Sequence, residues 1–135
     1  GDGSMMSMVE ERLGGLATTS ILKPIFGLSS FMSSFDYLFM PSEFEGLSML
    51  SMEASMNRLP VIANRCPGLS DTLPEDWPLM VDNNSLSAYL HLFRDVLPTA
   101  DHKALADKAA AFAEQNFSIR KMQEEYEKVY KDVSK

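Results

Sequence analysis

Apolar residues gather into three short runs without alternation, at positions 37–40, 60–63 and 78–81. Runs of this length, bounded by Asp, Asn or Pro, are typical of strands buried on both faces of a parallel sheet. A fourth, interrupted run at 21–26 predicts an edge strand, and residues 29–34 then predict a short helix. The pattern therefore predicts four strands.

Apolar residues recur every three or four positions elsewhere in the chain, which predicts amphipathic helices. Helices are expected at residues 5–16 behind a Ser4 or Ser7 cap, at 48–57, from about Ser85 onward, and twice in the tail, the second time behind Ser118. Strands that alternate with helices predict an α/β fold, a Rossmann-like doubly wound parallel sheet with right-handed crossovers. A length of 135 residues fits one domain spanning residues 1–135.

Composition excludes several classes of protein. No apolar run approaches the length of a membrane span. The first residues do not show a charged segment followed by a short apolar stretch and a small-residue cleavage site, and Cys66 is alone, so the expected location is the cytoplasm. A net charge of −7 argues against nucleic acid as a partner. The same charge means that a phosphate-bearing ligand would need backbone amides, a helix N-terminus or outside cations.

The candidate chemistry lies between the first and second strongly predicted strands. Gly46 would let a ligand approach the backbone, and the first amides of the next helix, those of residues 47–49, suit a diphosphate. From Ser48 to Glu53 such a helix rises about 7.5 Å, similar to the reach from a diphosphate to its ribose hydroxyls. Glu45, on the other side of the phosphate, would face an attached sugar. Two glutamates at this spacing are usually solvated helix residues, but the strand, loop and helix around them favour a ligand site.

The sequence resembles a known family at this point. The residues that carry the resemblance are 35–42, Glu45-Gly46, Glu53-Ala54, 59–63 and Pro67-Gly68, with Gly1-Asp2-Gly3 and Phe117-Ser118 near the two ends. Together they look like the donor-binding domain of GT-B glycosyltransferases of family 4, also called group 1. The spacing of Glu, seven residues and Glu is the hallmark of that family, and the resemblance runs nearly from end to end.

The resemblance implies a retaining glycosyltransferase that transfers a sugar from UDP, GDP or a similar carrier without a bound metal or other cofactor. It implies that Glu45 contacts the donor sugar at the reacting centre as the catalytic residue. The residues implied to bind the nucleotide-sugar donor are Gly3, Gly46, Leu47, Ser48, Met49 and Glu53. It further implies polysaccharide biosynthesis, with a glycan or lipid-linked acceptor and peripheral contact of the full-length enzyme with a membrane.

Two features of the family are absent from this chain. The Arg and Lys that bind the leaving diphosphate in the family belong to the first strand, loop and helix of the donor domain, which we expect to lie upstream of Gly1. We expect the acceptor-binding N-terminal domain of the family to be absent from this chain too. In the strand order 3-2-1-4-5-6 only strands three to six would remain. We therefore expect a partial domain that is inactive alone, with a homo-oligomer or a partner chain to complete the sheet. The alternatives are a non-catalytic or split-subunit docking module of GT-B fold, and a nucleotide-sugar epimerase.

Other candidate residues carry weaker signals. His91 and His102 have no carboxylate or cysteine partner at metal-ligand spacing, so neither receives a role. Cys66 has no paired base. Asp71 fits a ligand loop and a loop cap equally well, and Arg65 is the cation expected to reach a ligand, if only weakly.

Overall fold

A three-stranded parallel sheet organises the computed structural model, which describes residues 3–133. The strands are β1 (Leu38–Met40), β2 (Val61–Asn64) and β3 (Met80–Val81), in the order β1-β2-β3. Leu38 pairs with Val61 and Ala63 with Met80. All three apolar runs are therefore confirmed as strands. A parallel sheet flanked by helices is the Rossmann-like α/β fold that the sequence predicts.

Helices follow each of these strands and continue into the tail. Their bounds are α2 (Met49–Met56), η2 (Ser70–Thr72), α3 (Leu86–His91) with its continuations η3 (Leu92–Val96) and η4 (Leu97–Thr99), α4 (His102–Phe117) and α5 (Ile119–Val133). The side chains of Ser48, Ser85 and Asp101 each accept a hydrogen bond from the amide three residues onward. Such caps fix where a helix begins, and the helix starts near Ser48 and Ser85 are confirmed.

The core is one cluster of apolar side chains from the sheet, α2, α3 and α4. β2 is buried along its whole length, as expected for a central parallel strand. α2 packs against α4, and Arg58 just beyond α2 pairs with Asp107 of α4. Trp77 is buried beside the sheet, and its indole Nε1–H donates to the carbonyl of Val61 over 2.7 Å. This bond ties the loop before β3 to the central strand.

The N-terminal region departs from the sequence prediction. Residues 21–26 form no strand, so that prediction is wrong: a strand needs a hydrogen-bonded neighbour, none among the described residues lies beside this segment, and Pro24 lacks an N–H group. The short helix is confirmed as η1 (Leu28–Ser34), a 3-10 helix. α1 (Met6–Leu13) is capped by neither Ser4 nor Ser7, because Met5 holds the N-cap position without a side-chain hydrogen bond.

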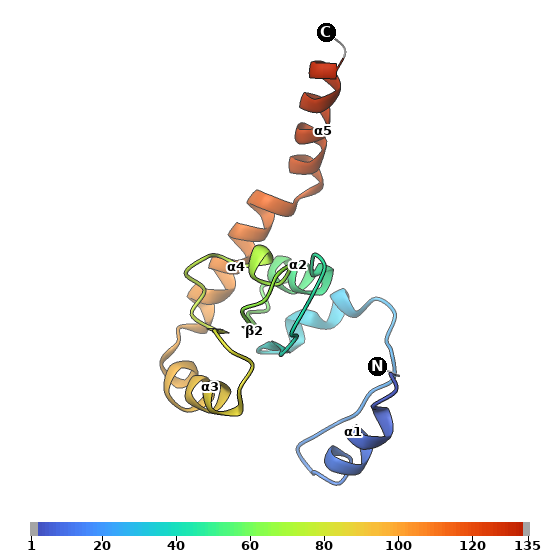
Figure 1. The fold of residues 1–135 in the computed structure, drawn as a ribbon, viewed down its shortest axis with the longest axis vertical. Helices are drawn as coiled ribbons and strands as arrows, with labels where there is room; N and C mark the ends of the chain where they lie inside the picture. The colour runs from blue at the N-terminus through green and yellow to red at the C-terminus, as the bar shows by residue number, and fades with distance from the viewer. Residues whose placement is uncertain (1–2, 134–135) are drawn as a thin grey trace.

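Both ends of the described chain lie outside the core. Figure 1 shows α1 set apart from the sheet and α5 extending away from it. None of the described residues of α1 or α5 is buried. No helix within residues 3–133 combines the length and the apolar character needed to cross a bilayer.

Replacing Trp77 with Phe should destabilise the core. The substitution leaves the Val61 carbonyl without its donor and opens space beside β2, so we expect the free energy of unfolding to fall by about 2–4 kcal/mol. Urea unfolding followed by circular dichroism measures the change. Phe26→Leu is the control, because Phe26 is fully exposed and its replacement should change stability by less than about 0.5 kcal/mol.

Candidate functional site

The candidate site is the loop of residues 41–48, which connects the carboxyl end of β1 to the N-terminus of α2. Ligands of open α/β sheets bind at this edge. The loop ends at Ser48, whose hydroxyl accepts a hydrogen bond from the Ser51 amide over 3.4 Å. The buried Ser48 side chain therefore sets the point at which the first amides of α2 become available.

A turn after β2 is hydrogen-bonded to this loop. In the turn from Cys66 to Leu69, Gly68 has φ = +78°, the left-handed value that the third position of a type II turn requires. The Pro67 carbonyl accepts from the Glu45 amide over 3.4 Å, and the Gly68 carbonyl accepts from the Ser48 amide over 3.2 Å. The two segments thus form one unit.

Gly68 is where the turn and the loop come closest. A Cβ atom at this position would lie 1.7 Å from the carbonyl oxygen of Gly46, which no side chain can tolerate. The amide of Gly68 donates to the Asp71 carboxylate over 3.1 Å. Of the two interpretations of Asp71, the structure displays the loop cap.

Gly46 itself faces open space. A Cβ atom there would meet nothing within 4 Å, so packing within the described residues does not require glycine at this position. Among the amides predicted to bind the donor, that of Ser48 already donates to Gly68. That of Met49 lies in the first turn of α2, where amides have no intrahelical acceptor, and so does the amide of Leu50, which the sequence analysis did not single out. The N-terminus of α2 therefore places partial positive charge next to the open space at Gly46, through which a ligand could approach.

The two glutamates differ in their surroundings. Glu45 is half-buried, and its Oε1 accepts a hydrogen bond from the Ser42 hydroxyl over 2.7 Å. Glu53 is exposed on α2, five residues after Ser48. One carboxylate thus precedes the N-terminus of α2 and the other lies within the helix, as the sequence predicted.

Two asparagines that the sequence analysis did not single out hold the loop. The side-chain amide of Asn64, at the end of β2, donates to the Ser42 carbonyl over 3.1 Å. That of Asn84 donates to the Pro41 carbonyl over 2.9 Å, and its Oδ1 accepts from the Tyr89 hydroxyl. A polar residue that closes an otherwise apolar strand was the available signal for Asn64, whereas Asn84 looked like an ordinary loop residue.

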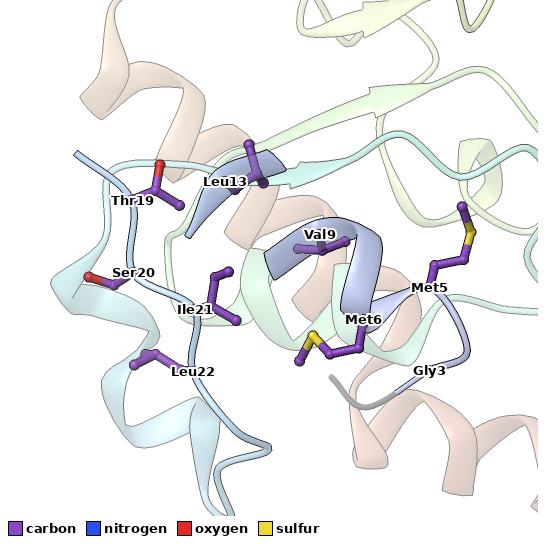
Figure 2. Close-up of a pocket in the computed structure, with 9 residues that line it drawn as sticks. All are labelled: Gly3, Met5, Met6, Val9, Leu13, Thr19, Ser20, Ile21 and Leu22. Carbon is purple, nitrogen blue, oxygen red and sulfur yellow. The ribbon is translucent and has the colours of Figure 1, made fainter. Parts of the chain in front are cut away.

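Gly3 is not brought to this loop. It lines an apolar hollow of about 410 Å³ between α1 and residues 19–22 (Figure 2). The hollow is lined by Gly3, Met5, Met6, Val9, Leu13, Thr19, Ser20, Ile21 and Leu22. It shares no residue with the loop of residues 41–48. The preceding Gly1-Asp2 of the predicted Gly-Asp-Gly loop lies outside the described residues.

Arg65, just after β2, and His91, the last residue of α3, each pair with a carboxylate. Arg65 Nε lies 2.8 Å from Asp82 Oδ1 in an exposed ion pair. His91 Nδ1 lies 2.7 Å from Asp95 Oδ2, so the expectation that His91 lacks a carboxylate partner is wrong. Within residues 3–133 the structure holds no group of three or more His, Cys, Asp or Glu side chains arranged to bind a metal.

Cys66 lies buried under the loop. Burial raises the pKa of its thiol, and the negative charge of Glu45 raises it further, while hydrogen bonds with the Leu69 and Glu45 backbones act in the opposite direction. The thiol is therefore held neutral, which is unfavourable for a nucleophile.

Comparison with known proteins finds a partial relationship. Over 49 residues the chain is 45% identical to the sulfoquinovosyl transferase SQD2 of Arabidopsis thaliana, a stretch that covers 36% of this chain and 10% of that protein. No known family profile matches the chain. The match supports a glycosyltransferase-like relationship at the level of the general class, and membership of family 4 stays a prediction.

The two glycines of the site should respond differently to alanine. Gly68→Ala combines a left-handed backbone with a clash against the Gly46 carbonyl, so we expect a loss of at least about 2 kcal/mol in the free energy of unfolding. Gly46→Ala should change it by less than about 0.5 kcal/mol. Chemical denaturation of both variants tests this difference, and equal destabilisation would contradict the open space at Gly46.

Cys66 should resist alkylation in the folded protein. Its raised pKa reduces the thiolate fraction at pH 8, and burial blocks the reagent. Iodoacetamide labelling followed by mass spectrometry should be slow in buffer and fast in urea. Because the folded state disfavours the thiolate, the free energy of unfolding should begin to fall as the pH rises past the pKa of the unfolded thiol. It should stop falling once the pH exceeds the raised pKa of the folded thiol. Rapid labelling under native conditions would show that the turn opens.

Proposed function

We propose that this chain provides the donor-binding half of a retaining glycosyltransferase of family 4, which transfers a sugar from a nucleotide-diphosphate sugar to a glycan or lipid-linked acceptor. The observation that carries the proposal is the N-terminus of α2, where first-turn amides meet the open space at Gly46 between two carboxylates. The partial match to a glycosyltransferase supports the same class.

Stabilising the leaving diphosphate is the main electrostatic task of such a reaction. The amides of Met49 and Leu50 and the positive end of α2 suit this anion. Arg65 contributes little, because it is paired with Asp82. With a net charge of −7, we infer that further cations come from the remainder of a full-length enzyme.

The glutamates would divide the contacts to the donor. Glu53 would accept hydrogen bonds from the ribose hydroxyls, since its position on α2 matches their distance from a diphosphate at the helix N-terminus. Glu45 would contact the sugar on the far side of the phosphates, close to the reacting carbon. A sugar attached to the distal phosphate would pass beside Gly46, where a side chain would take up the available space.

A docking module is the second candidate. The observation that favours it is the exposed apolar face of α5, which carries Ile119, Met122, Tyr126 and Val129. Such a face suits a partner protein or another part of a longer chain. A module that only docks has no use for the two glutamates, so nucleotide binding separates the two functions.

Calorimetric titration of UDP and GDP into the chain tests the donor site. We expect one of the two nucleotides to bind, and Glu53→Ala to weaken that binding about tenfold or more, since hydrogen bonds to a charged group are lost. Glu114→Ala removes the same charge from α4, beside the far end of α2, and should leave the affinity unchanged. If neither nucleotide binds, or if both variants weaken binding equally, the docking function takes its place.

A further inference from the structure

The Glu45 carboxylate is held by a neighbour to which the proposed site gives no role. Ser42 donates its hydroxyl hydrogen to Glu45 Oε1 over 2.7 Å, and both side chains are half-buried. A hydrogen bond to an ionised carboxylate is short and strong compared with a bond between neutral groups. Ser42 therefore restricts a side chain that would otherwise move between rotamers.

Both residues of this pair have an anchored backbone. The Ser42 carbonyl accepts from the Asn64 side chain of β2, and the preceding Pro41 carbonyl accepts from Asn84 of the loop after β3. The Glu45 amide donates to the Pro67 carbonyl in the turn after β2. The serine hydroxyl and the glutamate are thus fixed relative to the sheet, so their hydrogen bond can define one orientation of the carboxylate.

Within residues 3–133, only Oε1 of Glu45 accepts a hydrogen bond, which leaves Oε2 for a ligand. A carboxylate has two oxygens with about four acceptor positions, and Ser42 occupies one of these on Oε1. Oε2 then remains to accept hydroxyl groups of a sugar. A side chain that is already ordered loses less conformational entropy when the ligand binds.

We propose that Ser42 is a positioning residue that orients Glu45 toward the hydroxyl groups of the donor sugar. The inference rests on the proposed function, because it assigns the sugar to Glu45. It predicts that Ser42 matters for the sugar part of the donor and not for the nucleotide part, and that its whole effect passes through Glu45.

A double-mutant cycle tests this coupling with two probes, the nucleoside diphosphate that binds and the corresponding UDP-glucose or GDP-mannose. Ser42→Ala should weaken binding of the sugar nucleotide about tenfold and leave the diphosphate unchanged. In the Glu45→Ala background the same substitution should have no further effect. Ser42→Thr retains the hydroxyl group and should restore the affinity.

The possible outcomes distinguish the positioning role of Ser42 from the proposed donor-binding function. If Glu45→Ala weakens sugar binding and Ser42→Ala does not, the positioning role fails while the proposed function stands. If Ser42→Ala also weakens binding in the Glu45→Ala background, Ser42 acts independently of Glu45, and the inference is overturned. Loss of binding of both probes by Ser42→Ala alone would indicate a general disturbance of the loop and would also overturn it.

A measurement without ligand completes the test. The side-chain scalar couplings of Glu45, measured by NMR, should indicate one rotamer in the unmodified chain and rotamer averaging in Ser42→Ala. Averaging in both proteins would overturn the positioning role. If no nucleotide or sugar nucleotide binds, the proposed function fails and the sugar assignment of Glu45 fails with it, whatever the couplings show.

Discussion

The contact between Gly68 and the backbone at Gly46 is the constraint on which the candidate site depends. It brings the loop after β1 and the turn after β2 so close that a side chain has no room between them. Two backbone hydrogen bonds, from Glu45 to Pro67 and from Ser48 to Gly68, follow from this approach. The start of α2 and the position of Glu45 are therefore set by the neighbouring strand and not by the loop alone.

The central fold could be predicted from the sequence because its signals are local. Unalternating apolar runs define the three strands, and serine caps mark where α2 and α3 begin. The prediction of a strand at residues 21–26 was wrong for a non-local reason. The composition of this segment suits a strand, but a strand exists only beside another strand. No single-sequence pattern reports whether that neighbour is present among the described residues.

The candidate site was predictable in its chemistry and less so in its supports. The two glutamates and the helix start follow from their spacing and context, whereas Asn64 and Asn84 act through side-chain contacts across 22 and 43 residues. Such contacts depend on how the strands are placed side by side. The Ser48 amide, which already donates a hydrogen bond to Gly68, could not be predicted for the same reason, because its acceptor lies in a turn twenty residues onward. Gly3 resembled a loop of the family by position alone, and the structure places it in the α1 region.

The hydrogen bond of Trp77 to β2 has a consequence for optical studies. Trp77 is the sole tryptophan of the chain and is buried in the central core, so its fluorescence reports the sheet and the elements packed on it. α1 and α5 contribute helical ellipticity but bury none of their described residues. The ellipticity therefore covers α1 and α5 in addition to the core helices, whereas the fluorescence covers the core alone, so the two melting curves need not coincide.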